Sequence, residues 1–370
     1  MTAAVYPAEF VFPGHPDKLS DAIADAIVAA AWRREERALV GVEVAVHRDH
    51  VYLTGRVACD GAEDIDLEAL VRDVYRTAGY DASWRPSPDE VRVVSNVCVG
   101  PLEEGEAEFR ELADDQAICV GFANDLQATG HLPVEQWLVR RLAQRLHGLR
   151  ASAPELGLGP DGKVQITVRE RAEGWLLEAF SCSVQQQIAA DAVGLHRAVR
   201  VAVAEELQRA AHDLPGLRQE LPEHLVVNGA GDFEVGGPEG DNGLSGKKLV
   251  MDAYGPRVPI GGGAWSGKDF FKADRAGGLH ARRVAKAIVQ LGLAREARVV
   301  LGWFPGDRRA RVLRIEDEAG RLLDADRLGQ AFDLSLLRSG TAFGSEALAD
   351  AARWGHFVDP GRPWERSVAL

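Results

Sequence analysis

Helical segments alternate with pairs of strand-like segments along this chain of 370 residues, and no other feature constrains its fold as strongly. Residues 38–57 read as two strands joined by a turn with the sequence His-Arg-Asp-His. Residues 163–170 and 175–184 form a second such pair, and residues 297–304 and 309–317 form a third. Because so short a connection joins only antiparallel strands, each pair predicts an antiparallel sheet.

Apolar residues at intervals of three and four predict helices between these pairs. In residues 16–33, Leu19, Ile23 and Ile27 share one face, whereas Asp21 and Asp25 lie on another. Further helices are predicted at 66–80, 134–149, 191–212 and 278–291, and single strands at 90–99 and 224–237. No low-complexity linker interrupts the pattern. The chain is therefore predicted to be an α+β protein with several antiparallel sheets, one in each domain.

The balance of charges excludes several kinds of partner. The chain carries 56 acidic and 43 basic residues, which gives a net charge of −13. Such a surface repels nucleic acid and anionic membranes, so an anionic ligand needs a local basic cluster. No segment approaches the roughly 20 apolar residues of a membrane span, and no basic-then-apolar leader opens the sequence. The four cysteines form no metal-binding pattern, so we expect reduced thiols and a cytoplasmic protein.

The segment at residues 13–23 places charged side chains at the start of a helix. Its sequence is PGHPDKLSDAI, so His15, Asp17 and Lys18 crowd the first turn. Free backbone N–H groups at a helix N-terminus attract an anion, and His15 and Lys18 add further donors. Two interpretations stay open at this point, namely an anion site and a helix cap with no ligand.

The segment at residues 236–255 combines glycines with adjacent lysines. Its opening, GGPEGDNGLSGKK, implies a backbone that turns tightly or lets a ligand approach closely, with Lys247 and Lys248 at the end. The spacing matches neither the phosphate loop GxxxxGK[ST] nor a GxGxxG fingerprint between a strand and a helix. The glycines by themselves indicate either turns or a binding site.

The segment at residues 261–275 gathers both signs of charge behind three glycines, in the sequence GGGAWSGKDFFKADR. Lys268 and Lys272 can neutralise phosphate oxygens. Asp269 and Asp274 offer the hard oxygen ligands that suit Mg²⁺, which usually shares one or two carboxylates with a phosphate. A solvated, charged loop is the alternative. Taken together, three basic segments in an acidic chain favour a polyphosphate site with metal ions, provided that folding brings them together.

These three segments resemble the signature motifs of the S-adenosylmethionine synthetase (methionine adenosyltransferase) family. GHPDK, GGPEGDNGLSGKK and GGGAWSGKD…KADR occur in the family's order and spacing, and weaker similarity at 114–125, 160–168 and 354–365 covers nearly the whole chain. The resemblance implies three similar α/β domains with pseudo-threefold symmetry and mainly antiparallel sheets. We place these domains at about 1–102, 112–228 and 229–370, partly interleaved in sequence. It also implies a homodimer with shared active sites, with dimer against tetramer left open.

The chemistry implied by the resemblance is the formation of S-adenosylmethionine. The thioether sulfur of methionine attacks C5′ of ATP and expels the tripolyphosphate, which is then hydrolysed to phosphate and pyrophosphate. The leaving group is highly charged, so preorganised cations and Mg²⁺ stabilise it as the C5′–O5′ bond breaks. No general base is needed, because a thioether has no proton to lose. The implied cofactors are Mg²⁺ and K⁺.

The resemblance also implies roles for individual residues. His15 would donate to the departing oxygen, and Phe233 would stack on adenine. The metal ligands would be Asp17 and Asp274 for Mg²⁺ and Glu43 for K⁺. Phosphate or substrate would be bound by Lys18, Lys163, Lys248, Lys268, Lys272 and Lys247, the last standing where the family usually has arginine. The nucleotide would also contact Asp115 and Asp161, and Asp241 would lie near the amino acid group of methionine.

Departures from the family pattern lie on the amino-acid side of the implied site. Arg56, in YLTGRV, stands where the family usually has the glutamate that binds the substrate ammonium. Two like charges ~4 Å apart repel by about 4 kcal/mol at an effective dielectric of about 20. Three explanations stay open: Arg56 turns away, the register differs, or the thioether carries an extra carboxylate or lacks the ammonium. The segment 96–109 also lacks the family's glutamine, with Gly100 near that place.

We therefore expect a divergent enzyme that adenosylates L-methionine or a methionine-like thioether. Two alternatives are a non-catalytic paralogue that binds ATP and a protein that only hydrolyses tripolyphosphate. The retained charged residues argue against the first, because a protein freed from catalysis has no physical reason to keep like charges together. These residues are His15, Asp17, Lys163, Lys268 and Asp274.

Overall fold

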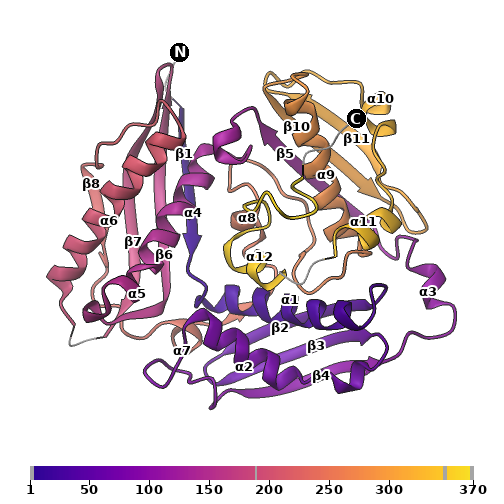
Figure 1. The fold of residues 1–370 in the computed structure, drawn as a ribbon, viewed down its shortest axis with the longest axis horizontal. Coiled ribbons are helices and arrows are strands. Elements are labelled where there is room, and N and C mark those ends of the chain that lie inside the picture. The colour runs from indigo at the N-terminus through magenta and orange to yellow at the C-terminus, as the bar shows by residue number, and fades with distance from the viewer. Residues whose placement is uncertain (1–3, 188–189, 345–347, 367–370) are drawn as a thin grey trace.

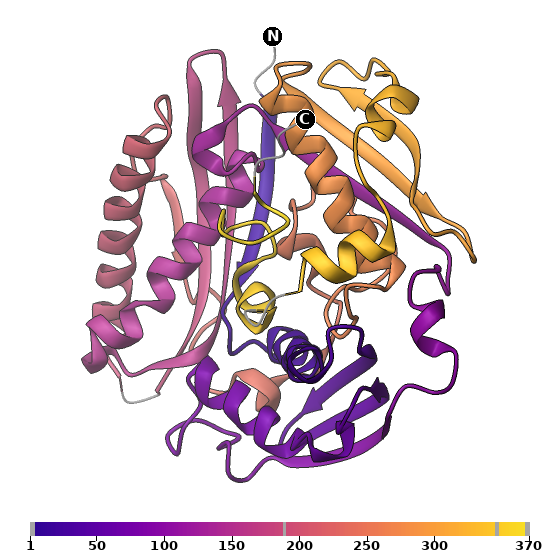
Figure 2. The same ribbon diagram turned by 45° about the vertical axis from the view of Figure 1, so that its right-hand side comes forward.

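Three sheets surround a shared centre in the computed structural model, which describes residues 4–187, 190–344 and 348–366. Figure 1 shows the sheets at the periphery, with α8 and α12 in the space between them. Figure 2, turned by 45°, shows α1 and α9 lying on the inner sides of two of the sheets. This arrangement agrees with the predicted α+β class and its three sheet-containing domains.

The sheet built mainly from the middle of the chain has the strand order β1-β6-β7-β8. Its strands are β1 (Ala4–Val11), β6 (Leu158–Arg171), β7 (Gly174–Gln186) and β8 (His224–Val227). Two helices, α4 (Val134–His147) and α6 (Ala192–Asp213), share one hydrophobic core with it. Leu138 of α4 and Val199 of α6 are both fully buried in this core.

The second sheet, at the bottom of Figure 1, has the order β4-β3-β2-β9. Its strands are β2 (Leu39–His47), β3 (His50–Ala58), β4 (Arg92–Gly100) and β9 (Gly243–Leu244). Helices α1 (Pro16–Arg34) and α2 (Leu67–Ala78) pack on one face. The other face is open to solvent and carries apolar side chains such as Tyr52, Val94 and Leu244.

The third sheet has the order β11-β10-β5 and packs against one long helix. Its strands are β5 (Ala117–Asn124), β10 (Glu296–Trp303) and β11 (Arg311–Asp317), and the helix is α9 (Ala273–Gln290). The other helices described are short: α3 (Glu106–Phe109), α5 (Leu149–Ser152), α7 (Gly237–Gly240), α8 (Leu249–Asp252), α10 (Ala325–Gln330), α11 (Leu336–Ala342) and α12 (Leu348–Trp354). Three 3-10 turns are η1 (Ala62–Asp64), η2 (Gln127–Thr129) and η3 (Pro154–Leu156).

Each sheet takes one strand from a distant part of the sequence. β1 pairs with β6, β5 pairs with β10, and β9 pairs with β2, all antiparallel. The three predicted hairpins are confirmed, as β2–β3, β6–β7 and β10–β11. Two pairs, β3–β4 and β7–β8, are parallel, so the sheets are mainly rather than wholly antiparallel. These strands from distant parts of the sequence connect the three domains.

The predicted helices are present, although one begins earlier than its sequence suggests. α9 starts at Ala273 rather than at the predicted Gly278. A Cβ at Gly278 would overlap the indole of Trp265, so this glycine permits close packing inside the helix and does not end it. β1 and β5 were not predicted as strands, and β8 is much shorter than the predicted strand at 224–237. No described helix is both long enough and apolar enough to cross a membrane.

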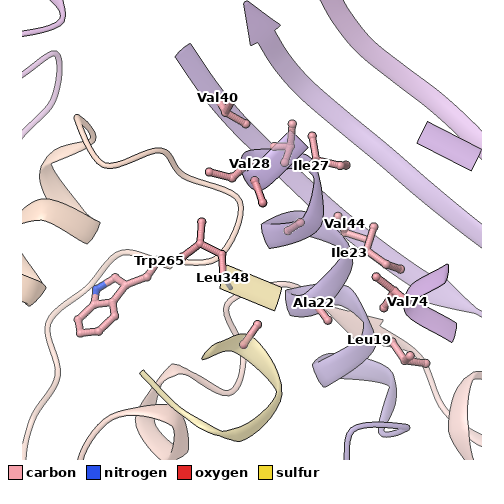
Figure 3. Close-up of a cluster of buried hydrophobic side chains, with 14 of the residues drawn as sticks. Leu19, Ala22, Ile23, Ile27, Val28, Val40, Val44, Val74, Trp265 and Leu348 are labelled. Atoms are coloured by element: carbon pink, nitrogen blue, oxygen red, sulfur yellow. The ribbon is translucent and has the colours of Figure 1, made fainter. Parts of the chain in front are cut away.

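Helix α1 is buried on nearly all sides at the junction of the three domains. Figure 3 shows its side chains Ile23 and Ile27 beside Val40 and Val44 of β2, with Trp265 and Leu348 nearby. The polar side of α1 is buried as well, because Lys18, Asp21 and Asp25 are at most 1% exposed. Buried charges are tolerated only with partners. Asp25 pairs with Arg275 of α9 at 2.6 Å, and this ion pair joins two domains.

We expect Arg275→Met to destabilise the protein by about 3–5 kcal/mol, because it leaves a buried carboxylate without its cation. Burial already raises the pKa of Asp25 and Arg275 opposes that effect, so the variant raises this pKa further. A carboxyl with a raised folded-state pKa loses stability as pH rises, so the deficit should be larger at pH 8 than at pH 5. Guanidinium unfolding at both pH values measures it.

The matched control is Arg76→Met, since Arg76 makes only exposed ion pairs with Asp73 and Asp89. We expect a change of at most about 1 kcal/mol at either pH. Equal effects of the two substitutions would contradict the role assigned to the buried pair.

Candidate active site

The carboxylates of α1 hold the two glycine-rich segments in place. Aspartates at positions 17, 21 and 25 are four residues apart, so they line one side of the helix. Three backbone amides donate to them: Leu244 N–H to Asp17 (2.9 Å), Gly246 N–H to Asp21 (2.7 Å) and Gly267 N–H to Asp25 (3.0 Å). One helix thereby positions the loops that carry the predicted phosphate-binding lysines.

Lys18 belongs to this buried network and not to a ligand surface. Its side chain is fully buried, and its ammonium forms an ion pair with Asp252 of α8. Burial raises the pKa of Asp252 to about 6, and Lys18 opposes that effect. Enclosure of Lys18 argues against its predicted contact with phosphate.

A first group of predicted site residues forms around Asp17. Lys248 Nζ lies 2.8 Å from Asp17 Oδ2, and Lys247 Nζ lies 3.8 Å from Oδ1. Burial raises the pKa of Asp17, but hydrogen bonds donated by Lys248 and by the backbone amide of Leu244 outweigh it, so the pKa is lowered. The carboxylate is therefore ionised at neutral pH and lies between two ammonium groups.

His15 is the N-cap of α1 and has a defined tautomer. Its Nδ1 accepts the backbone N–H of Asp17 at 3.2 Å, so the neutral ring carries its proton on Nε2. Burial lowers the pKa of His15, Asp161 raises it, and Lys248 lowers it again. The imidazole is thus neutral at pH 7, with Nε2–H available as a donor.

The other residues of the first group lie on β6 and the loop that follows β8. Asp161 is buried and accepts the N–H of Gly237 at 2.7 Å, which fixes the start of the segment 236–255. Lys163 is partly exposed and pairs with Glu9 at 2.5 Å. Phe233 lies beside Gly236, where a Cβ would come within 2.9 Å of its ring. Asp241 is exposed and accepts the N–H of Asn242.

A second group forms in the segment 261–275 and its surroundings. Lys268 Nζ lies 2.6 Å from Asp274 Oδ2. Both residues line a cavity of about 850 Å³ together with Asp115 and the glycines 261–263. Its other wall is apolar and includes Trp303 and Phe304. Asp269, by contrast, is buried and paired with Arg110, so it is a structural residue.

Lys272 and Arg56 lie side by side at the edge of this group. Arg56 faces Gly41 across the β2–β3 ladder, and Lys272 Cε lies 3.9 Å from the place that a Cβ of Gly41 would occupy. Each cation has an acidic partner, since Lys272 pairs with Asp114 and Arg56 Nη2 lies 2.7 Å from Glu106 Oε2. Arg56 therefore contributes no uncompensated positive charge here.

Glu43, the predicted potassium ligand, lies on the open face of β2. Its carboxylate accepts the hydroxyl hydrogen of Ser245 at 2.7 Å, and both residues line a shallow hollow of about 430 Å³. In the described part of the chain, no three His, Cys, Asp or Glu side chains gather as a metal site. Any metal held here would therefore need oxygen ligands from a bound substrate as well.

Among the described residues, no member of the first group lines the cavity of the second group, although the two loops touch, since a Cβ on Gly246 would lie 2.6 Å from the Cβ of Ala264. The 850 Å³ cavity is lined by Lys268 and Asp274 but not by His15 or Asp17.

The sequence did not predict three ion-pair partners that the fold supplies: Asp252 for Lys18, Asp114 for Lys272, and Glu106 for Arg56. The acid-rich stretch 103–108 was the available signal for Glu106.

Family models match the chain in three consecutive parts. The N-terminal, central and C-terminal domains described as S-adenosylmethionine synthetase match residues 3–98, 110–233 and 235–366. Among curated relatives, S-adenosylmethionine synthase 1 of Frankia casuarinae is 32% identical over 400 residues, covering 99% of this chain and 97% of the relative. S-adenosylmethionine synthase of Thermus thermophilus is 33% identical over 398 residues, covering 97% of this chain and 95% of the relative.

We expect Gly263→Ala to impair any activity of the second group without unfolding the protein. A Cβ at this position would overlap the carboxylate of Asp274, which must then leave its place beside Lys268. The matched control is Gly262→Ala, because a Cβ there meets no atom within 4 Å. Turnover should fall at least about tenfold for Gly263→Ala, equivalent to ~1.4 kcal/mol, with unchanged circular dichroism. Equal turnover in the two variants would contradict a functional Asp274.

Proposed function

The chain belongs to the S-adenosylmethionine synthetase family, and we infer that it forms S-adenosylmethionine from ATP and L-methionine, releasing phosphate and pyrophosphate. The observation that carries this conclusion is the similarity to S-adenosylmethionine synthases over nearly the full length of this chain and of its relatives. A methionine adenosyltransferase needs cations beside the leaving triphosphate and a place for the amino acid. The two residue groups supply candidates for both.

On the leaving-group side, the chain's own residues can neutralise the departing triphosphate and donate hydrogen bonds to it. His15 presents Nε2–H, because Nδ1 is occupied by a backbone amide, and this N–H can donate a hydrogen bond that stabilises the charge on the C5′ oxygen as the bond breaks. Lys248 and Lys268 are each paired with a carboxylate that a phosphate can displace. The sulfur of methionine gives up an electron pair and no proton, so the site needs no base.

We propose that Asp17 and Asp274 are the carboxylates that would hold magnesium. Each is a single hard oxygen donor beside a lysine, which fits an ion that completes its shell with phosphate oxygens and water. When bound, the metal would supply charge neutralisation on the triphosphate. Glu43, exposed beside Ser245, is the carboxylate proposed for potassium.

On the amino-acid side, we propose that the paired charges still suit a zwitterion. Lys272 and Arg56 can attract the methionine carboxylate, and Glu106 and Asp241 can attract its ammonium. Support comes from the pairing of Arg56 with Glu106, which removes the repulsion expected from an unpaired arginine. We therefore propose plain L-methionine as the thioether.

We propose that the active site is completed by a second copy of the chain. Within one chain, none of the described residues around Asp17 lines the cavity beside Asp274, whereas the reaction needs both groups on one ATP. The open face of β2–β4 offers apolar side chains such as Tyr52 and Val94 for such a contact. Analytical ultracentrifugation showing a fully active monomer would contradict this proposal.

The free cysteines and acidic surface are compatible with the cytoplasm, where we place the protein.

Incubation with ATP, with and without L-methionine, tests the function. We expect S-adenosylmethionine by mass spectrometry, with phosphate and pyrophosphate released together, and loss of product when Mg²⁺ is chelated. Replacing K⁺ by a bulky organic cation should slow turnover. Phosphate release without sulfonium would instead indicate a tripolyphosphatase. Absence of both products would indicate a non-catalytic paralogue.

We expect Glu106→Gln to raise the KM for L-methionine about tenfold, since the loss of one charge-assisted contact costs about 1.4 kcal/mol. The variant also removes the charge of the 2.7 Å partner of Arg56 and leaves the exposed Glu103 carboxylate at 3.5 Å, so the guanidinium repels the substrate ammonium more strongly. The KM for ATP should stay unchanged. Glu108→Gln, an exposed carboxylate on the same short helix, is the control. A methionine KM that is identical in the two variants would rule out the proposed role of Glu106.

A further inference from the structure

A second polar cavity, of about 440 Å³, is lined by none of the residues placed in the two site groups. Its walls come from η2, α4, α9 and the segment 357–366, so it lies between the central and C-terminal parts of the chain. None of the residues that line it lines the 850 Å³ cavity beside Asp274. The proposed synthesis of S-adenosylmethionine therefore makes no use of this space.

The cavity contains a buried arginine without a partner. Arg140, on α4, lines the cavity and is 8% exposed, and within the described chain its guanidinium makes no hydrogen bond or ion pair. Burial, together with the neighbouring Arg141 and Arg362, lowers the pKa of Arg140 to about 9. It is therefore still a cation at pH 7. A buried cation without a counter-charge is costly, so a bound anion would relieve it.

The other charges around the cavity leave a positive excess. Among the described residues, Lys286 and Arg366 also line it, against one acid, Glu365. The Glu365 carboxylate is already shared, because it accepts from Arg282 Nε at 2.9 Å and from Lys286 Nζ at 3.0 Å. No carboxylate among the described lining residues is left for Arg140. This local excess is notable in a chain whose net charge is −13.

The neutral part of the wall suits a small anionic ligand. His131 Nδ1 lies 2.8 Å from the carbonyl oxygen of Asn124 and so carries the ring proton there, while burial lowers the pKa of His131. The ring is therefore uncharged at pH 7 and adds no repulsion or attraction of its own. Trp137 and Phe357 supply apolar surface on the remaining sides. A planar guanidinium in such a space can bind two oxygens of one anion at once.

We propose that this cavity is a second ligand site, distinct from the active site, that binds a small oxyanion through the guanidinium of Arg140. Phosphate and carboxylate groups share the required geometry, and either could be the physiological head group. The site links α4 to α9, so an occupied cavity would brace the central domain against the C-terminal domain.

Isothermal titration of the full-length protein with inorganic phosphate, and separately with acetate, tests the site in the absence of ATP. Phosphate binding at the active site should be the same in all variants. The difference in binding between the parent and the Arg140 variants therefore measures the proposed second site. We expect Arg140→Met to lose this event or weaken it at least about tenfold, and Arg140→Lys to retain part of it. Arg145→Met, on the same helix but paired with Glu205, is the matched control and should bind as the parent does.

Two further readouts separate a ligand site from a structural arginine. In buffer without phosphate or carboxylate, Arg140→Met should unfold at a higher temperature than the parent, because an uncompensated buried charge is gone. Adding the anion should raise the unfolding temperature of the parent more than that of the variant. Identical anion binding by parent and Arg140→Met, for both probes, would overturn the proposal whatever the outcome of the synthetase assay. A response to only one probe identifies the head group.

Discussion

The buried acidic side of α1 is the constraint on which the site depends. A helix enclosed by three domains cannot expose its carboxylates to water, so they need donors from the protein. Backbone amides of the two glycine-rich loops supply them. The glycines are required where the loops bend toward α1: Gly246 and Gly267 have φ of 84° and 85°, and a Cβ on Gly267 would overlap the carbonyl oxygen of Val42. The hydrogen bonds between the loop backbone and the α1 carboxylates therefore position the lysines that follow these glycines. The lysine side chains take no part in those backbone hydrogen bonds.

The same arrangement explains how the chain tolerates several ammonium groups near one another. Lys248, Lys268 and Lys272 each have a carboxylate within ion-pair distance, so the free protein holds no large uncompensated charge at these points. In the proposed active site, a polyphosphate would replace these carboxylates as the counter-charge and release them to a metal. Binding then exchanges ion pairs and does not have to overcome repulsion between lysines. This is the physical sense in which carboxylates and lysines belong in the same loops.

The two sides of the proposed active site differ in how closely they follow the family pattern. By the resemblance, motifs on the triphosphate side are nearly unchanged, whereas Arg56 stands where the family pattern implies a glutamate on the amino-acid side. The fold offsets this change locally, because α3 brings Glu106 to the guanidinium. When position 56 is considered alone, an arginine there would repel the substrate ammonium. When Glu106 is included, the two charges offset each other and the arginine is tolerated. Distances between side chains, and not residue identity alone, decide the local charge.

The sequence by itself determined the fold class, most helices and the three hairpins, because hydrophobic periodicity and tight turns depend on residues that are neighbours in the chain. It also determined the family, because the three motifs are continuous stretches of sequence. It also indicated His15, Asp17, Lys268 and Asp274, which stand in long motifs. Tertiary structure alone decided which strands cross between sheets, that Lys18 is buried against Asp252, and that none of the described residues around Asp17 lines the cavity beside Asp274. The sequence likewise did not predict that Arg140 is buried beside a cavity. Pairings of this kind join residues far apart along the chain, and no local pattern encodes the burial or the partner that a folded chain gives them.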